Sequence, residues 1–453
     1  MFTNRDRLFE PRTRNVLPYR FGRNYNGNFD GSAQWDRLPD GILVKIFSKL
    51  DQKDLMKAAR VCQSWQEVIN STALFWRKIH LKLQRSKNKK YCQKAVHHIR
   101  KRGIYFRELS VTCCHGNETT GFAQTIDCFC RLVQTLPMQL NLTKLKISDL
   151  RLHGVWNNLG LVRKTMIHLL SRQDELECFQ MSSARWPIRE GKSILRALFT
   201  VSKRTLRSLE IDGFFEPDAA SQGPDVFDEV FAGIRSLSRL TKLGLDYGLM
   251  SDVFLLELPG SQATQLRVLK ISTKLVDGST TIVSRKSWET LTTAIPALKV
   301  TFTIEGVYSL IKMVRILNPA IPVKKIRLML QTGPNEPEVG SVTTAALLGH
   351  ITMNFRHSLN KFELDIGKKS GFIDLAFIGL VRKCTHLIDV KTPKQFSHPE
   401  SERVVRALIE QRRRKREMRL TRNLANKRVK QNPVDQAGPS TANATIPEGL
   451  STK

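Results

Sequence analysis

The 453-residue chain lacks the features of a membrane or secreted protein. No apolar run reaches the roughly 18 residues that a membrane-crossing helix needs. Residues 1–34 lack the apolar stretch of a secretory signal. They are rich in Arg, Asn and Gly without any period, which predicts a disordered segment. We therefore expect an intracellular protein, in the nucleus, the cytoplasm or both, that makes no membrane contact.

Signatures of catalysis and of cofactor binding are also missing. The chain has no P-loop, no G-x-S-x-G, no H-E-x-x-H and no kinase motif. Its eight cysteines include no C-x-x-C pair, and the group at Cys113, Cys114, His115, Cys128 and Cys130 fits no common zinc spacing. We expect reduced thiols, no metal, no cofactor and no catalytic step carried out by this chain.

Acidic residues are scarce. The chain holds 41 Asp and Glu against 73 Lys and Arg, a formal net charge of +32. Part of this excess lies in residues 401–430, but much of it is spread along residues 36–400. Such a charge favours acidic proteins, nucleic acid or anionic surfaces as partners and does not choose among them. Aromatic residues, at 8%, give no sign of a platform for stacking bases.

The segment 35–83 has the pattern of several short helices. Pro39 suits the first position of a helix, and the residues after it place apolar side chains on one face, at Ile42, Leu43, Ile46, Phe47 and Leu50. Asp51 and Asp54 favour the start of a second helix. A third short helix follows, and a fourth is expected to begin at Leu74. This small unit carries more apolar surface than it can hide, which predicts a docking face.

These residues resemble the F-box family. The matching positions are Leu38, Pro39, Ile42, Leu43, Ile46, Phe47, Leu50, Leu55, Val61, Cys62, Trp65, Leu74 and Trp76. The resemblance implies a trihelical module that binds a Skp-type adaptor, and through it a cullin, with these thirteen residues as the adaptor-binding set. The alternative is an ordinary helical hairpin that caps the following domain.

From about residue 100 a short motif, apolar-x-x-apolar-x-apolar, returns along the chain. Because its apolar positions alternate, each copy predicts a strand with one buried face. The expected strands lie at residues 108–112, 144–148, 178–182, 208–212, 242–246, 268–272, 326–330 and 361–366. Weaker copies lie at 295–304 and near Leu387. Helical patterns separate the strands, which predicts an α/β solenoid. Two stretches that hold Gly, Pro and acidic residues, at 213–225 and 331–341, predict surface loops.

The array resembles a leucine-rich repeat, although the usual Asn or Cys after the strand is missing. The resemblance implies a horseshoe. An ordinary α/β domain of βα units is the alternative. In such repeats the residues between the apolar positions face the concave side. The candidate substrate-binding residues there are Lys144, Lys146, Lys242, Lys270, Lys325, Arg327 and Lys361.

The C-terminal part of the chain is basic. Residues 401–430 hold 12 Lys and Arg against three Glu, with the densest run at Arg412, Arg413, Arg414, Lys415 and Arg416. Like charges at i,i+4 destabilise an isolated helix, so we expect residues 411–430 to be disordered. The run resembles a nuclear localisation signal or a nucleic-acid patch. A merely solvated run is the alternative.

We therefore expect four parts: a disordered segment at 1–34, the F-box at 35–83, the solenoid at 84–400 and a basic tail at 401–453. The resemblance implies a substrate-recognition subunit of a Skp–cullin–F-box (SCF) ubiquitin ligase. The F-box would hold the adaptor and the solenoid an unidentified protein substrate. The alternative is a basic nuclear or nucleic-acid-associated scaffold that uses its F-box without ubiquitylation.

Overall fold

Most of the chain between residues 38 and 431 is described by the structure, a computed structural model. The described residues are 38–84, 88–114, 120–152, 156–216, 219, 222, 224–260, 265–274, 282–306, 309–330, 341–366, 371–391 and 396–431. The expected N-terminal segment 1–34, most of the predicted loop at 331–341 and the end of the chain beyond residue 431 lie outside them. The chain divides into two compact units. One spans residues 1–339 with 364–367, and the other spans 340–363 with 368–453.

The N-terminal part of the first unit is helical. It consists of α1 (Asp40–Phe47), α2 (Gln52–Ala58), α3 (Gln63–Ser71) and the 3-10 turn η3 (Ala73–Trp76). The Asp51 carboxylate accepts a hydrogen bond of 2.8 Å from the backbone N–H of Asp54, so Asp51 caps α2 as predicted. The prediction of a fourth helix that begins at Leu74 is wrong. It is a single 3-10 turn because the chain becomes a strand at Lys78.

Eleven strands follow in the described chain. They are β1 (Lys78–Gln84), β2 (Glu108–Cys114), β3 (Lys144–Ser148), β4 (Cys178–Ser182), β5 (Ser208–Glu210), β6 (Lys242–Asp246), β7 (Val268–Lys274), β8 (Lys299–Glu305), β9 (Val323–Leu330), β10 (Lys361–Ile366) and β11 (Asp389–Lys391). Their order in the sheet follows the chain, and the registered pairs are parallel. This order is that of a solenoid in which each repeat adds one strand beside the last.

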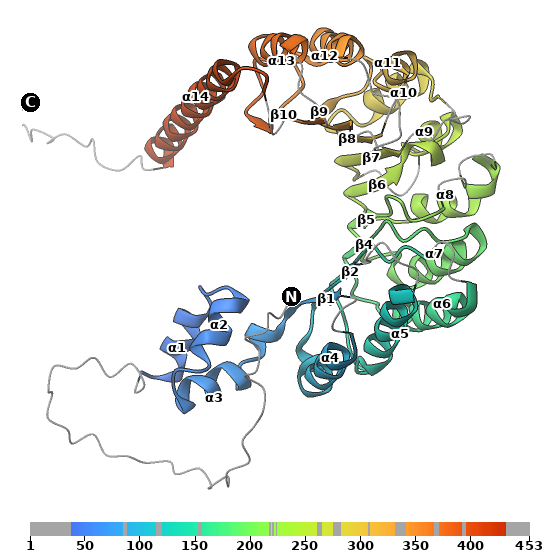
Figure 1. Cartoon of the computed structure of the whole chain (residues 1–453), viewed down its shortest axis with the longest axis vertical. Helices are drawn as coiled ribbons and strands as arrows, with labels where there is room; N and C mark the ends of the chain where they lie inside the picture. Colours follow the sequence, from blue (N-terminus) through green and yellow to red (C-terminus); the bar gives the residue numbers. More distant parts are fainter. Residues whose placement is uncertain are drawn as a thin grey trace, which may run out of the picture. The chain divides into compact units, whose positions relative to one another are not determined.

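Helices and turns connect successive strands. They are α4 (Asn88–Arg102), η5 (Gly103–Tyr105), α5 (Thr120–Thr135), α6 (Trp156–Leu170), α7 (Ile188–Ser202), η7 (Pro224–Phe227), α8 (Asp228–Arg235), η8 (Tyr247–Leu249), α9 (Asp252–Glu257), α10 (Arg285–Ala294), α11 (Leu310–Ile316), α12 (Ser341–Phe355), α13 (Gly371–Lys383) and α14 (Pro399–Gln431). In the first unit, helices α4–α11 cover one face of strands β1–β9 (Figure 1). None of the described helices combines the length and apolar composition that a membrane crossing requires.

The core of the first unit is a ladder of apolar side chains. The register aligns one residue from each of the strands β2–β8, namely Leu109, Leu145, Phe179, Leu209, Leu243, Leu269 and Val300. Each of them is buried, with at most 2% of its surface exposed. Their neighbours in sequence point to the opposite face, as the two-residue period of a strand requires. The predicted α/β repeat architecture is confirmed.

All eight predicted strands are present, and three others are found. The weak copy at 295–304 is β8, the one near Leu387 is β11, and β1 was missed. Strand β1 lies inside the segment assigned to the F-box, so the first strand of the sheet begins before residue 84. Ile79, Leu81 and Leu83 alternate in β1 and pack inward once β2 pairs with it.

Part of the predicted loop at 213–225 is core. Phe214 and Phe215 are buried, and Phe215 packs against Phe227 with a ring-centroid distance of 5.2 Å. This apolar pair was hidden among Gly, Pro and acidic residues that indicated a surface loop.

In the second unit, residues 361–363 of β10 pair with β11 in parallel, and α12, α13 and α14 are its helices. The disorder predicted for residues 411–430 is wrong, because α14 is helical to Gln431. The side chains of Val405 and Ile409, near the start of this helix, are buried. Opposite charges at i,i+4, Glu402 with Arg406 and Glu410 with Arg414, offset the like-charge repulsion on which the prediction depended.

Candidate functional site

The thirteen F-box positions divide into a core and a surface. Leu43, Phe47, Leu55 and Trp76 are at most 3% exposed and form one apolar cluster with Val68, Ile69 and Phe75. Side chains this buried cannot contact a partner, so these four are corrected from adaptor-binding residues to residues that hold the module together. The helical period alone does not distinguish the buried positions from the exposed ones, because adjacent apolar residues on α1 lie at the edge of one face.

The surface part is an apolar set that we call the F-box ridge. Its members are exposed and come from α1 with its N-cap, the turns after α1 and α2, and η3: Pro39, Ile42, Ile46, Leu50, Val61 and Leu74. Pro39, Ile42 and Ile46 are spaced by three and four residues, so they share a face of α1. Five of the seventeen large apolar side chains exposed on the described residues fall within residues 42–74. This concentration exceeds the scattered exposure that is normal on a surface, and it is typical of a docking face.

The remaining three F-box positions are half-buried. Leu38 and Trp65 pack against the apolar cluster from its edge, and Cys62 is partly exposed. The Trp65 ring meets Phe47 edge to face, with ring centroids 5.1 Å apart. These residues join the buried core to the ridge, so they are placed both to support it and to contact a partner.

A buried cation joins the F-box helices to the first helix of the solenoid. The guanidinium of Arg102, at the end of α4, lies 3.9 Å from the centroid of the Trp76 ring. It also donates to the side-chain oxygen of Asn70 at 2.5 Å and lies 2.9 Å from Nδ1 of His98. Sequence reasoning missed this cluster. The available signal was that Arg102 continues the buried stripe of α4 through Ala95 and Ile99.

His98 gives this joint a pH dependence. Burial, followed by the positive charges of Arg102, His97 and Lys101, lowers the pKa of His98 to about 4. The ordinary value of 6.5 applies in the unfolded chain, so unfolding takes up a proton between these two values. The contribution of His98 to stability is therefore fully present above pH 6.5 and is lost as the pH falls toward 4.

We predict that this loss amounts to at most roughly 3 kcal/mol in the free energy of unfolding between pH 6.5 and 4. His98→Gln, which keeps an oxygen for Arg102 but does not titrate, should flatten the dependence in urea titrations at several pH values. The control is His386→Gln, at an exposed position. An unchanged slope for His98→Gln would show that other groups cause the acid sensitivity.

The candidate substrate-binding residues lie on the strand positions that alternate with the core ladder. We call this surface of β1–β9 the open face. Lys144 and Lys146 lie on β3, Lys242 on β6 and Lys270 on β7, while Lys325 and Arg327 lie on β9. Lys361 lies on β10 and pairs with Asp389 at 3.0 Å. Lys146 is exposed and forms no ion pair among the described residues.

Two glutamates on the open face each hold a pair of lysines. Glu210 on β5 receives Lys242 at 2.5 Å and Lys270 at 2.6 Å. Glu108 on β2 receives Lys144 at 3.2 Å, and Lys78 at the same distance. Burial alone would raise the pKa of Glu210, but the hydrogen bonds from its two lysines outweigh that effect and hold the pKa below its ordinary value. The ion-paired groups of each cluster have an excess of one positive charge, and the carboxylate of Asp212 also lies close enough to the Glu210 cluster to interact with Lys270.

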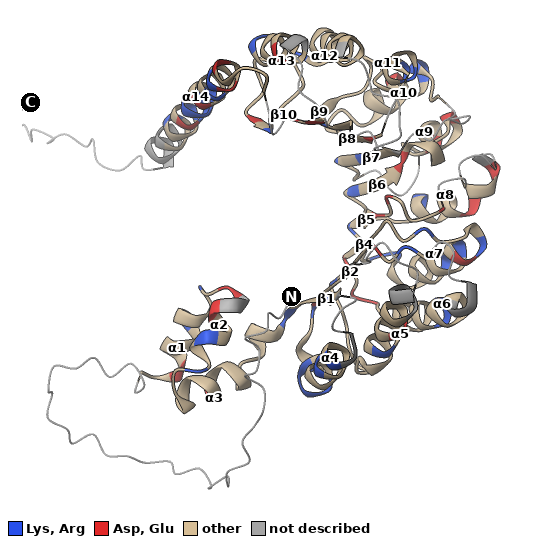
Figure 2. Ribbon diagram, viewed as in Figure 1, with Lys and Arg blue, Asp and Glu red and all other residues tan. Residues whose placement is uncertain are grey.

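The basic run at 412–416 divides into residues that contact the rest of the second unit and residues that are exposed. Arg412 is half-buried, and its guanidinium donates to the carbonyl oxygens of Val381 at 2.6 Å and Cys384 at 2.9 Å, near the end of α13. Arg413 donates to the carbonyl of Ile388 at 2.9 Å. These two arginines, predicted as members of a nuclear localisation signal or nucleic-acid patch, are therefore corrected to structural contacts, whereas Arg414, Lys415 and Arg416 are exposed. Lys and Arg outnumber Asp and Glu along α14 (Figure 2).

We predict that Arg412→Ala destabilises the docking of α14, because carbonyl oxygens that now accept hydrogen bonds would lose their donor. A cost of about 1–3 kcal/mol is expected for such a loss. Hydrogen exchange of the amides of α14 should report it as faster exchange. Arg416→Ala, at an exposed position of the same helix, serves as control and should leave exchange unchanged. Equal exchange in the two variants would contradict the structural role of Arg412.

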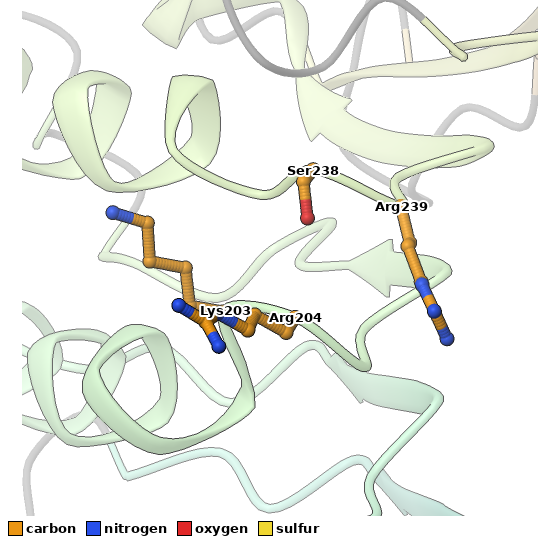
Figure 3. A pocket seen from close by; sticks show the side chains of 4 residues that line it. All are labelled: Lys203, Arg204, Ser238 and Arg239. Carbon is orange, nitrogen blue, oxygen red and sulfur yellow. The ribbon is translucent and has the colours of Figure 1, made fainter.

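A shallow hollow lined mainly by cationic residues lies between the turns that precede β5 and β6. Its lining residues are Lys203, Arg204, Ser238 and Arg239 (Figure 3). The three cations are exposed at its rim, and Figure 3 shows Arg239 pointing away from the other side chains. No buried polar group is aimed into the hollow among these residues, so it lacks the preformed donors of a specific ligand site.

The cysteine group has the character of core residues. Cys113, Cys128 and Cys130 are buried and free, while His115 lies outside the described residues. Burial raises the pKa of Cys130 to about 11. Such a thiol stays protonated at neutral pH and is a poor nucleophile and metal ligand.

Comparison with known proteins identifies the N-terminal module. The family model described as F-box-like matches residues 35–82. A leucine-rich-repeat-containing protein from Legionella pneumophila, LegL7, has a similar structure at 15% identity. The match covers 74% of this chain and 98% of that one, with a TM-score of 0.39. The TLR13–ssRNA13 complex matches at 12% identity, over 64% of this chain and 42% of that one, with a TM-score of 0.27.

These two structures are too different from this chain to support an argument about its fold. The order of the strands in the sheet is by itself that of a leucine-rich-repeat-like solenoid. The chain is a protein-interaction adaptor that carries an F-box-like domain followed by a leucine-rich-repeat-like solenoid. Both parts are typical non-catalytic interaction modules.

Proposed function

We propose that this chain is the substrate-recognition subunit of an SCF-type ubiquitin ligase. The F-box ridge binds a Skp-type adaptor, which connects the chain to a cullin, and the open face of the solenoid binds a protein substrate. The observation that carries the proposal is the exposed apolar ridge on a module that matches the F-box-like family. Ubiquitin transfer is then a matter of proximity, because the complex raises the effective concentration of the charged ubiquitin carrier near substrate lysines.

The structure of the joint supports this mechanism. Proximity is effective only if the two binding surfaces keep a constrained geometry, and a long flexible connection would dilute it. Here the cluster of Arg102, Trp76, Asn70 and His98 ties the F-box helices to α4, with no linker between η3 and β1 beyond Arg77. The adaptor-binding module is therefore continuous with the first repeat.

The test is affinity capture from cells in which the proteasome and cullin activation are blocked, so that substrates are retained. The full chain should capture a Skp-type adaptor, a cullin and at least one protein that accumulates when this chain is depleted. A chain that lacks residues 36–71, and so keeps η3 and β1 on the solenoid, should lose the adaptor and the cullin but keep the substrate. Capture of adaptor and cullin by the shortened chain would remove the basis of the proposal.

We keep a second candidate function, a nucleic-acid-associated or nuclear scaffold, because α14 presents an exposed basic surface. Lys415, Arg419 and Arg422 are spaced by four and three residues, so they share a face of the helix. Exposed cations on one face of a rigid helix can contact successive phosphates, and such binding weakens steeply with salt.

Its test removes charges without disturbing Arg412. The triple change Lys415→Gln, Arg419→Gln and Arg422→Gln should lower salt-sensitive retention on DNA or RNA and reduce the nuclear signal. The matched control removes three charges elsewhere, with Lys203→Gln, Arg204→Gln and Arg239→Gln. If the two triple variants behave alike, the α14 surface contributes only general charge and the second function loses its support.

A further inference from the structure

The lysine pair on Glu210 reaches across a whole strand. Glu210 lies on β5 and Lys242 on the neighbouring β6, but Lys270 lies on β7 and still approaches the carboxylate to 2.6 Å. In register, Gly244 stands between Glu210 and Lys270. A Cβ atom at Gly244 would lie 3.3 Å from Cα and Cγ of Glu210, tighter than ordinary contact. The absence of a side chain at Gly244 therefore leaves the space over β6 through which Lys270 extends.

The charge balance of this cluster leaves a cationic site. The Glu210 side chain is 6% exposed, and each of its oxygens is taken by one ammonium group. The side chains of Lys242 and Lys270 are 32% and 41% exposed, so their ammonium groups stay accessible from the open face. An ammonium group has three donors and uses one of them on Glu210. Two neighbouring ammonium groups that share one carboxylate can therefore receive a second anion.

A second cationic site lies on β3. Lys144 and Lys146 are two residues apart and point to the same open face. Lys144 shares Glu108 with Lys78, and Lys146 has no acidic partner among the described residues. Strands β3 and β6 are three positions apart in the sheet, which corresponds to about 14 Å at the usual strand spacing. An extended chain covers that distance with about four residues.

The rest of the open face favours a protein segment over nucleic acid. Between and beside the two sites lie small, neutral polar or acidic residues: Ser110, Ser148, Gln180, Ser182, Asp212 and Asp246. The carboxylates of Asp212 and Asp246 would repel a continuous phosphate backbone, whereas a ligand with two separate charges can avoid them. None of these residues is aromatic, so the face offers no platform for stacking bases.

We propose that the open face of β2–β7 binds an extended protein segment that carries two anionic side chains about four residues apart. Lys242 and Lys270 receive one anionic group, and Lys144 and Lys146 receive the other. The groups are carboxylates or phosphates, which share the same recognition chemistry. The inference rests on the proposed function, in which the solenoid holds a protein substrate.

The probe is a degenerate pool of 12-residue peptides with phosphoserine at positions 4 and 8, retained on the immobilised full chain at low salt. We expect stronger retention than for a pool with aspartate at both positions, and little retention for a pool with serine. The reverse order for aspartate and phosphoserine would assign the site to carboxylates. A pool with phosphoserine at positions 4 and 5 should be retained less, and equal retention would overturn the two-site arrangement.

Variants separate the site from general charge. Glu210→Gln frees both lysines and should raise retention at least twofold. Retention should fall at least fivefold when all three residues Glu210, Lys242 and Lys270 become Gln, a change that leaves no charge unpaired. Lys144→Gln with Lys146→Gln should lower retention by the same factor, because it removes the other anion site. Glu108 stays paired with Lys78 in this variant. The control, Lys203→Gln with Arg204→Gln, should change nothing, and circular dichroism should show that all variants are folded.

Unchanged retention in both lysine-site variants overturns the inference, and so does stronger retention of a 12-nucleotide single-stranded RNA than of the phosphopeptide pool. Adaptor capture by the same protein preparations makes the two failures distinguishable. If the adaptor binds but the peptide pool does not respond to the variants, only this inference fails. If the pool responds but the adaptor is not captured, the ligase function fails while the peptide site stands.

Discussion

Replacing Ile42 and Ile46 by alanine should weaken the binding of a Skp-type adaptor by about a hundredfold or more, because anchors of this kind are worth on the order of 2 kcal/mol each. Both side chains are exposed on α1, at 42% and 40% of their surface, so their truncation removes contact area without opening a cavity. The free energy of unfolding should therefore stay within about 0.5 kcal/mol of the wild-type value.

Two variants control this experiment. Ile311→Ala removes an equally large exposed side chain from α11 and should leave adaptor binding unchanged. Leu43→Ala removes a fully buried neighbour on α1 and should weaken binding only by destabilising the module, which thermal unfolding would reveal. Titration of purified adaptor into each variant gives the dissociation constants. Wild-type affinity in the Ile42, Ile46 double variant would show that the ridge is not the adaptor-binding surface.

Truncating Leu243 to alanine should cost roughly 2–5 kcal/mol in the free energy of unfolding of the first unit. Leu243 is fully buried on β6 and stands in register between Leu209 and Leu269. Because each repeat packs on its neighbours, a cavity at this position weakens the interfaces on both sides. Denaturant titration followed by circular dichroism measures the effect, with Ile311→Ala as the exposed control. A cost below about 0.5 kcal/mol would contradict the continuous ladder.

The strand ladder could be predicted because each strand carries its own signal. In β3, Leu145 and Ile147 alternate with lysines, and the same period recurs at nearly every repeat. Strand β1 has that period too, but it follows the F-box helices without a break and was assigned to them. The boundary between the F-box and the solenoid was therefore misplaced. A local pattern does not show at which residue the chain stops packing against the F-box helices and begins to pack in the solenoid.

The division of the F-box residues was beyond the sequence for a related reason. Ile42 and Leu43 are adjacent and equally apolar, yet one is exposed and the other is fully buried. Which of them faces inward depends on how α3 and η3 pack against α1, and this is decided by contacts between residues distant in the chain. The family resemblance likewise marks both kinds of position without separating them.

The polar clusters could not be predicted, because they depend on register. Glu210 and Lys270 are sixty residues apart and meet only because Gly244 stands between them. The composition around Arg412 predicts a nuclear localisation signal or nucleic-acid patch, but the carbonyl oxygens at the end of α13 accept the hydrogen bonds of Arg412. Long charged side chains with several donors find partners that no local pattern records.

The most direct test of the central claim is calorimetric titration of a purified Skp-type adaptor into the purified full chain. We predict saturable binding with one adaptor per chain and a dissociation constant at or below the micromolar range, about −8 kcal/mol or stronger. Binding should be abolished by deletion of residues 36–71. Absence of binding by a full chain that circular dichroism shows to be folded would contradict the claim that this chain is an adaptor-bound recognition subunit.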